Sequence, residues 1–156
     1  MKTEILLVDD EDLILRSVTY ALKKEGYQIT TAKNGEEAME KLKVASFDLV
    51  ITDLQMEGMN GIEVLKKVRQ INPDAFVIIL TAHGSLASVV DAKRLGVVDY
   101  LLKPIDSVDL AARVASCLEK YEMQKQIKAL KAKLSEYEKT PGKNENPASS
   151  EDRLTE

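Results

Sequence analysis

Side chains that can handle phosphate or a divalent cation follow four short apolar runs of this sequence. They are three carboxylates, one hydroxyl and one ammonium: Asp9, Asp10, Asp53, Thr81 and Lys103. Two or three carboxylates, with room left for water and a phosphoryl oxygen, suit Mg²⁺ better than zinc. Because the sequence holds a single cysteine and a single histidine, we expect no competing Cys/His site. These residue types predict Mg²⁺-dependent phosphoryl chemistry.

Asp53 is the candidate nucleophile, because a carboxylate can attack a phosphoryl group to form an aspartyl phosphate. Mg²⁺ and the Lys103 ammonium would neutralise charge on the equatorial oxygens, and Thr81 could donate a hydrogen bond to one of them. Helix N-capping is the alternative interpretation of the acidic run that starts at Asp9. Within that run we expect Asp12 to serve as a cap.

These side chains need a sheet whose strands all end at one edge. Apolar runs without alternation indicate strands buried on both faces, as in a parallel sheet covered by helices: Ile5–Val8, Leu49–Thr52 and Phe76–Leu80. The more polar Gln28–Ala32 is expected at an edge, and a short strand at Leu101–Leu102 completes the set. Helical patterns lie between the strands: Leu13–Lys24, a helix opening at Asn34 or Gly35, Ile62–Ile71, Leu86–Leu95 after Ser85, and a fifth helix capped by Asp106 or Ser107.

The alternation of strand and helix predicts an α/β fold, doubly wound around a five-stranded parallel sheet. In the strand order 2-1-3-4-5 the topological switch lies between the first and third strands, and ligands bind beyond their carboxyl ends. Asp9, Asp10 and Asp53 end those two strands, so the fold and the chemistry select one crevice. In the first helix we expect an apolar face packed against the sheet: Leu13, Ile14, Val18, Ala21 and Leu22.

The pattern changes after about Tyr121, which predicts a domain of residues 1–121, a helical extension of residues 122–139 and a disordered tail of residues 140–156. Apolar residues of the extension recur at the 4-3-4-3 spacing of a coiled coil: Met123, Ile127, Leu130, Leu134 and Tyr137. This stripe favours a homodimer through the helix, and folding back on its own domain is the alternative. The polar tail has too few apolar residues to offset its ordering entropy by burial.

Composition narrows the class of protein. A net charge of -4 and a pI near 5.2 argue against direct nucleic-acid binding. No apolar run approaches the ~18 residues needed to span a bilayer, and no signal peptide opens the chain, which favours the cytoplasm and no membrane partner. Cys117 is expected to be a small buried hydrophobe. His83 is expected to be a loop residue, or alternatively one that tunes water access to the site.

Four motifs resemble those of a response regulator receiver domain of two-component signalling: Val8-Asp9-Asp10-Glu11, Ile51-Thr52-Asp53-Leu54-Gln55-Met56, Leu80-Thr81-Ala82 and Tyr100-Leu101-Leu102-Lys103-Pro104. The match covers about residues 1–121 and implies a flavodoxin-like fold. It implies that Asp53 is the phosphoacceptor. It also implies that Asp10, Asp53 and the Gln55 carbonyl bind Mg²⁺ directly, while Asp9 binds it through water.

The resemblance also implies roles on the other side of the crevice. Thr81 and Lys103 would contact the phosphoryl group, Tyr100 would be an aromatic switch, and Lys103-Pro104 resembles the family's cis-proline step. The implied partner is a sensor histidine kinase or a phosphotransfer protein. The stretch from Thr81 to Tyr100 is similar to receivers of sigma-54-dependent activators, whose receiver runs into a dimerising helix. No ATPase or DNA-binding pattern follows in this sequence, so the output stays open.

Three interpretations therefore compete. The first is a receiver switched by phosphorylation, which catalyses only its own phosphorylation and dephosphorylation. The second is a Mg²⁺-dependent phosphohydrolase of related fold, but such enzymes place an acid/base aspartate two residues after the nucleophile, where this chain has Gln55. The third is a regulatory and dimerisation fragment of a larger transcriptional activator. The polar tail slightly favours a natural end over a linker.

Overall fold

The computed structural model describes residues 2–139, and in that range strands and helices alternate in the predicted order. The strands are β1 (Glu4–Val8), β2 (Gln28–Ala32), β3 (Leu49–Thr52), β4 (Phe76–Thr81) and β5 (Asp99–Leu102). The helices are α1 (Asp12–Lys24), α2 (Gly35–Val44), α3 (Gly61–Ile71), α4 (Leu86–Arg94) and α5 (Ser107–Glu138). The predicted tail, residues 140–156, lies outside the described residues.

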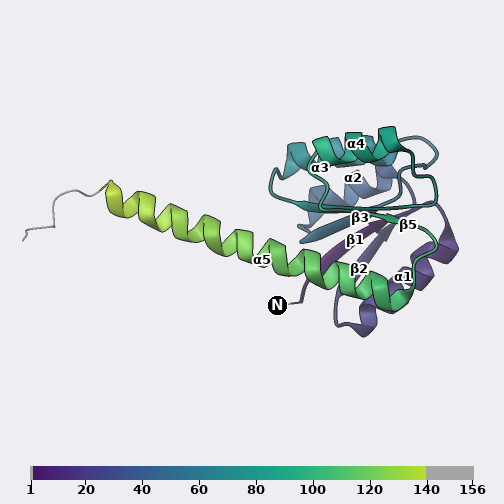
Figure 1. Ribbon diagram of the computed structural model, residues 1–156, viewed down its shortest axis with the longest axis horizontal. Helices are drawn as coiled ribbons and strands as arrows, with labels where there is room; N and C mark the ends of the chain where they lie inside the picture. The colour runs from purple at the N-terminus through teal and green to yellow at the C-terminus, as the bar shows by residue number, and fades with distance from the viewer. Residues whose placement is uncertain (1, 140–156) are drawn as a thin grey trace, which may run out of the picture. The chain divides into compact units, whose positions relative to one another are not determined.

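The five strands form one parallel sheet in the order β2-β1-β3-β4-β5, which confirms the predicted doubly wound topology. The register pairs Val8 with Thr52 and Thr81 with Leu102. Because neighbouring strands end level with one another, the residues that follow them meet at one edge. Figure 1 shows α2, α3 and α4 on one face of the sheet, and α1 with the first part of α5 on the other.

Two apolar layers hold the sheet between its helices. On one face, β-strand residues such as Ile5 and Ile78 pack with α1 and with Leu110 and Val114 of α5. On the other face, Leu6 and its neighbours pack with α2 and α3. All residues of β3 and β4 are buried, which explains why their sequences lack the alternation of half-exposed strands.

The start of α1 differs from the prediction in two ways. Leu13 is 75% exposed, and Leu15, which was not predicted on the packed face, is buried. The buried positions Leu15, Val18 and Leu22 follow one another at helical spacing, and Leu13 lies outside that stripe. Asp12 is not a cap but the first residue of the helix, and it forms an ion pair with Arg16 at 3.0 Å.

The starts of α2 and α4 agree with the predicted caps Asn34 and Ser85, and α3 has a cap, Asn60, that was not predicted. The side chains of Asn34, Asn60 and Ser85 each accept a hydrogen bond from the backbone N–H three residues later. Asp106 accepts one from the Val108 N–H, so it is Asp106 rather than Ser107 that caps α5. Cys117 is buried, as predicted, and burial raises the pKa of its thiol to about 12.

Helix α5 is one continuous helix of 32 residues, whereas the sequence pattern divides it after Tyr121. The chain separates into two units at the same point, Met1–Tyr121 and Glu122–Glu156. Tyr121 packs edge-on against Phe76, with ring centroids 5.1 Å apart. Among the described residues, no helix is long and apolar enough to cross a membrane.

Candidate functional site

Backbone hydrogen bonds fix the predicted site residues at the carboxyl edge of the sheet. The Asp9 N–H donates to the carbonyl of Ala32 on β2, and the Asp53 N–H donates to the carbonyl of Val8 on β1. The Lys103 N–H donates in the same way to the Thr81 carbonyl at 2.8 Å. Each functional residue is therefore anchored to the end of the neighbouring strand, and its side chain points beyond the sheet edge.

Lys103 connects the two buried carboxylates of the site. Its Nζ donates to Asp9 Oδ2 at 2.6 Å and to Asp53 Oδ2 at 3.0 Å. The Glu11 carboxylate lies 3.6 Å from the same ammonium. The side chains of Lys103, Asp9 and Asp53 are only 7%, 2% and 3% exposed, so water screens these contacts weakly. The peptide bond between Lys103 and Pro104 is cis, as the resemblance implied.

Burial and hydrogen bonding shift the pKa values of Asp9 and Lys103. Burial raises the pKa of Asp9 above 3.8, and the hydrogen bonds from Lys103 and from the Glu11 N–H offset only part of that increase. Burial lowers the pKa of Lys103, but its hydrogen bonds to Asp9 and Asp53 raise it more, so the net pKa lies above 10.5. The ammonium therefore stays charged at neutral pH, and a second cation would favour the ionised form of Asp9.

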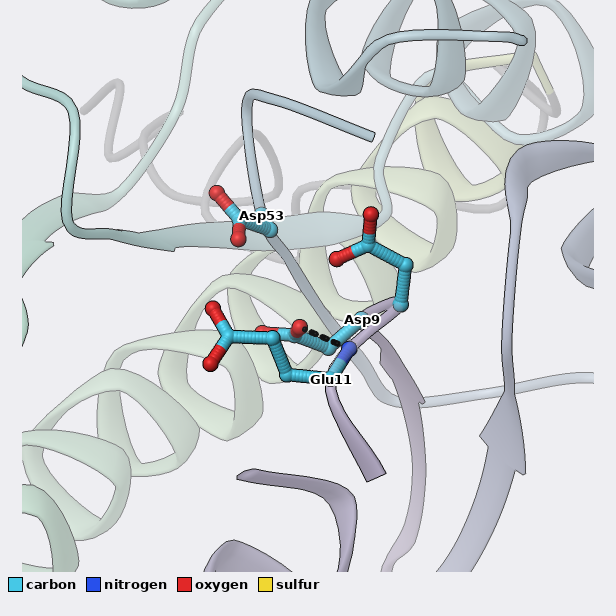
Figure 2. A group of neighbouring side chains, drawn as sticks. Asp9, Glu11 and Asp53 are labelled. Carbon is cyan, nitrogen blue, oxygen red and sulfur yellow. Dashed lines mark hydrogen bonds between the residues drawn. The ribbon is translucent and has the colours of Figure 1, made fainter. Parts of the chain in front are cut away.

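Four carboxylates form the candidate metal site. Oxygen atoms of Asp9, Asp10, Glu11 and Asp53 lie within 4.8 Å of one another. Figure 2 shows Asp9, Glu11 and Asp53 gathered beyond β1 and β3, with the Glu11 N–H bonded to the Asp9 carboxylate at 2.9 Å. Their donor set contains only oxygen, and one Lys103 charge does not balance it, so the residues fit Mg²⁺. Asp9, Asp10, Glu11 and Asp53 would hold the ion.

Glu11 is a member of this cluster that the sequence did not assign to the metal. It follows Asp10 in the chain and belongs to the first quoted motif, so proximity in sequence was the available signal. Asp10 and Glu11 are exposed, whereas Asp9 and Asp53 are buried. Gln55, predicted to supply its carbonyl, donates its N–H to Asp53 Oδ1 at 3.3 Å. This bond and the one from Lys103 engage both oxygens of the Asp53 carboxylate.

The close approach of α3 to the candidate nucleophile depends on Gly61. A Cβ on this residue would overlap the Asp53 carbonyl oxygen and would lie 2.8 Å from Leu54 Cα. The Gly61 N–H also donates to the Leu54 carbonyl at 2.9 Å. Both clashing atoms belong to the backbone and cannot rotate away, so only glycine fits here without moving the loop that carries Asp53.

Thr81 and Tyr100 lie on the strands at the other side of the site. Thr81 is fully buried, and its Oγ1 accepts a hydrogen bond from the His83 N–H at 3.2 Å. Tyr100 is half-buried and packs with Ile79 and Ala92, and its hydroxyl lies 3.0 Å from Ser88 Oγ on α4. His83 is an exposed loop residue, in agreement with its first predicted role.

An open hollow of about 920 Å³ lies next to the carboxylates. Residues from the loops after β1, β3 and β4 line it, among them Asp10, Gln55, Glu57, Asn60 and His83. Of the four carboxylate residues, Asp10 lines this hollow, while Asp53 is buried just before the loop residues that line it from Leu54 onward. The site thus combines four carboxylates that could hold a metal ion, a paired lysine and a buried hydroxyl at a topological switch point.

Comparison with known proteins agrees with this arrangement. Residues 5–115 match the model of the response regulator receiver domain family. The chain is 40% identical over 126 residues to the alginate biosynthesis transcriptional regulatory protein AlgB of Pseudomonas aeruginosa, covering 81% of this chain and 28% of that protein. It is 39% identical over 115 residues to the transcriptional regulatory protein GlrR of Escherichia coli, covering 74% and 26%. The chain spans less than a third of the length of these relatives.

Solved structures of receiver domains and response regulators also resemble this chain. A receiver domain protein from Methanospirillum hungatei superposes with a TM-score of 0.77 at 30% identity, covering 80% of this chain and 99% of that one. The response regulator protein TrrA from Thermotoga maritima, solved in complex with Mg²⁺ and BeF, gives 0.68 at 38% identity, covering 75% and 99%. The chain therefore belongs to the response regulator receiver domain family of two-component signal transduction.

Proposed function

We propose that Asp53 accepts a phosphoryl group from the histidine of a sensor kinase or a phosphotransfer protein, and that Mg²⁺ is required. The observation that carries this proposal is the buried Asp53 carboxylate, fixed by Lys103 and the Gln55 N–H and surrounded by three further carboxylates. Receiver domains take part in two-component signalling with such donors. The solved relative in complex with Mg²⁺ and BeF supports the same use of this site.

In the proposed reaction an Asp53 carboxylate oxygen forms a bond to phosphorus, while the bond between phosphorus and the donor histidine nitrogen breaks. When bound, Mg²⁺ supplies positive charge beside the phosphoryl oxygens. Lys103 Nζ, now 3.0 Å from Asp53 Oδ2, can turn one of its N–H donors toward a phosphoryl oxygen. The Thr81 hydroxyl can donate its proton to another, because its oxygen serves here as an acceptor for His83.

The signal then passes to the surface formed by α4, β5 and α5. When Thr81 turns to the phosphoryl group, the loop from Thr81 to Ser85 moves with it, and Tyr100 adjusts against that loop. Phosphorylation biases two existing conformations, and the shift cannot exceed the difference in its interaction with them. In this proposal the protein acts in the cytoplasm as a switch and catalyses only its own phosphorylation and dephosphorylation.

The rival interpretation, a phosphohydrolase, is tested by turnover. With Mg²⁺ and excess acetyl phosphate, we expect at most one phosphoryl group per chain, measured by intact mass. With p-nitrophenyl phosphate, an ordinary phosphomonoester, we expect no sustained release of phosphate, because Gln55 stands where an acid/base aspartate would be needed. Continuous turnover of the ester that disappears in Asp53→Asn would contradict the switch and support an enzyme.

We further propose that the helical extension forms a homodimer. Its stripe residues are 49–68% exposed, although they are large and apolar: Met123, Ile127, Leu130, Leu134 and Tyr137. Pairing with a second copy would bury this stripe and leave the flanking lysines in water. The much longer transcriptional regulators that match this chain are consistent with a second possibility, a regulatory and dimerisation part of a larger activator.

Light scattering over a concentration series tests the dimer. The wild-type mass should rise with concentration, and Leu130→Asp should lower it without affecting phosphorylation of Asp53. Ala132→Asp is the matched control, because it adds the same charge at an exposed position outside the stripe. Wild-type monomers at all concentrations would contradict the dimer and favour packing of the extension on its own domain.

A further inference from the structure

The hydroxyl of Ser88 is the centre of a hydrogen-bond group that joins β5 to the first turn of α4. Its oxygen donates to the Ser85 carbonyl at 2.9 Å and accepts from the Ser85 N–H at 3.1 Å. It also lies 3.0 Å from the Tyr100 hydroxyl. A serine hydroxyl has one proton and two lone pairs. Because the Ser88 proton goes to the Ser85 carbonyl, Tyr100 is the donor in its bond to Ser88, and it shares the remaining lone pair of the Ser88 oxygen with the Ser85 hydroxyl, which lies 3.1 Å away.

The same group caps α4. The Ser85 hydroxyl accepts from the Ser88 N–H at 3.1 Å, and with the Ser88 hydroxyl it completes a capping box. The Val89 N–H donates to the Ser85 carbonyl at 3.0 Å, the first backbone hydrogen bond of the helix. The start of α4 therefore depends on Ser88, whose hydroxyl is also the partner of Tyr100.

Tyr100 lies against the loop that leads from Thr81 to this cap. A Cβ built on Gly84 would lie 3.6 Å from both Cε1 and the hydroxyl oxygen of Tyr100. The Tyr100 side chain packs against a small apolar cluster of Ile79, Ala92 and Leu54, and Leu54 is the residue that follows Asp53. Ring, loop and helix start are thus in contact, and Ser88 supplies the polar link among them.

We infer that Ser88 is a latch that makes the Tyr100 side chain and the first turn of α4 one switching unit. Tyr100 cannot leave this position without giving up its bond to Ser88, and α4 cannot unwind at its start without moving the partner of Tyr100. The latch stabilises the conformation seen here. Its trigger rests on the proposed function, since phosphorylation of Asp53 would move the loop after Thr81.

A double-mutant cycle tests the latch, with the exchange of the Val89 amide hydrogen as the readout. Tyr100→Phe removes one hydroxyl and should speed exchange about 2- to 10-fold, the effect of one net hydrogen bond. In the Ser88→Ala background, Tyr100→Phe should have no further effect, because its partner is already absent. Ser88→Thr keeps a hydroxyl and should restore the effect of Tyr100→Phe.

Ser85→Ala is the matched control. It weakens the same cap but leaves the Ser88 hydroxyl in place, so Tyr100→Phe should still speed exchange in that background. An equal effect of Tyr100→Phe with and without the Ser88 hydroxyl, or no effect in the wild type, would overturn the latch. The cycle is measured without a phosphoryl donor, so its outcome does not depend on Asp53 chemistry. Labelling by acetyl phosphate is measured separately, and an unlabelled wild type would contradict the proposed function alone.

Discussion

The Lys103 ammonium lies 2.6 Å from a carboxylate oxygen of Asp9, a residue 94 positions away in the chain. Both side chains are almost fully buried, and the same ammonium also binds Asp53. A buried ion pair of this kind contributes little net stability, because desolvation of the charges offsets their attraction. Its value lies in placing a fixed positive charge beside Asp53.

Removing that charge should separate phosphorylation from metal binding. We expect Lys103→Ala to slow phosphorylation of Asp53 by acetyl phosphate by about 10²-fold, the typical effect of losing one charge-stabilising donor. Mg²⁺ affinity should hold or rise, because a cation that binds the same two carboxylates, Asp9 and Asp53, is lost. Calorimetric Mg²⁺ titrations and labelling rates measure the two effects.

Lys93→Ala is the matched control for Lys103→Ala. It removes the same charge from an exposed position at the end of α4 and should change neither quantity. If Lys103→Ala abolished Mg²⁺ binding in a folded protein, the lysine would be supporting the metal site rather than competing with it.

The raised pKa of Asp9 predicts how Mg²⁺ binding depends on pH. Since burial keeps the neutral form of Asp9 stable above pH 3.8, Asp9 is partly protonated at pH values where an exposed aspartate is ionised. Mg²⁺ binds the ionised carboxylate, so its affinity should fall as pH decreases from neutral, starting at a higher pH than an exposed aspartate would set. A titration series downward from neutral pH checks this. An affinity that falls only as the pH approaches 3.8 would show that burial does not raise the pKa of Asp9.

Thr81 should be needed for transmission rather than for phosphorylation. We expect Thr81→Ala to be labelled at Asp53, while the change in amide hydrogen exchange over α4 and β5 on phosphorylation is lost or greatly reduced. Thr30→Ala, the same substitution on the edge strand β2, should keep the wild-type response. A response of wild-type size in Thr81→Ala would contradict the proposed route through the loop after β4.

Gly61→Ala should destabilise the fold and disturb the site. The new Cβ would meet the backbone of Asp53 and Leu54, so we expect a loss of about 1–3 kcal/mol in the free energy of unfolding. Gly84→Ala is the control, because its Cβ would come too close only to the tip of the Leu102 side chain, which can rotate, and would lie at ordinary contact distance from Tyr100. Its change should stay within about 0.5 kcal/mol. Urea unfolding measures both, and equal stabilities would contradict the close contact at Gly61.

The placement of the main site residues could be predicted because the strand sequences are unambiguous. The runs that precede Asp9, Asp53 and Lys103 are short and apolar, and in a parallel sheet such strands end at one edge. The phase of α1 was harder to predict. Leu13, Ile14 and Leu15 are consecutive apolar residues, so a helical stripe can pass through more than one of them, and only packing against the sheet selects Leu15.

The contacts that individual side chains make were less predictable than the places of these residues in the fold. The sequence placed Lys103 and Asp9 in one crevice, but it gave no sign that they form the shortest ion pair there. Likewise, Ser88 is an ordinary residue for the first turn of a helix, and Tyr100 is an ordinary aromatic on a strand. Their hydrogen bond depends on the tertiary arrangement of β5 and α4, which no spacing in the chain encodes.

Identifying the phosphorylated residue is the most direct test that Asp53 is the phosphoacceptor. After incubation with Mg²⁺ and acetyl phosphate, reductive trapping of the aspartyl phosphate and peptide mass mapping should place one modification per chain, on Asp53. Asp53→Asn should give no modified peptide, whereas Asp48→Asn, the same substitution at the residue before β3, should be labelled like the wild type. Modification of another residue in the wild type, or undiminished labelling of Asp53→Asn, would contradict the assignment of Asp53 as the phosphoacceptor.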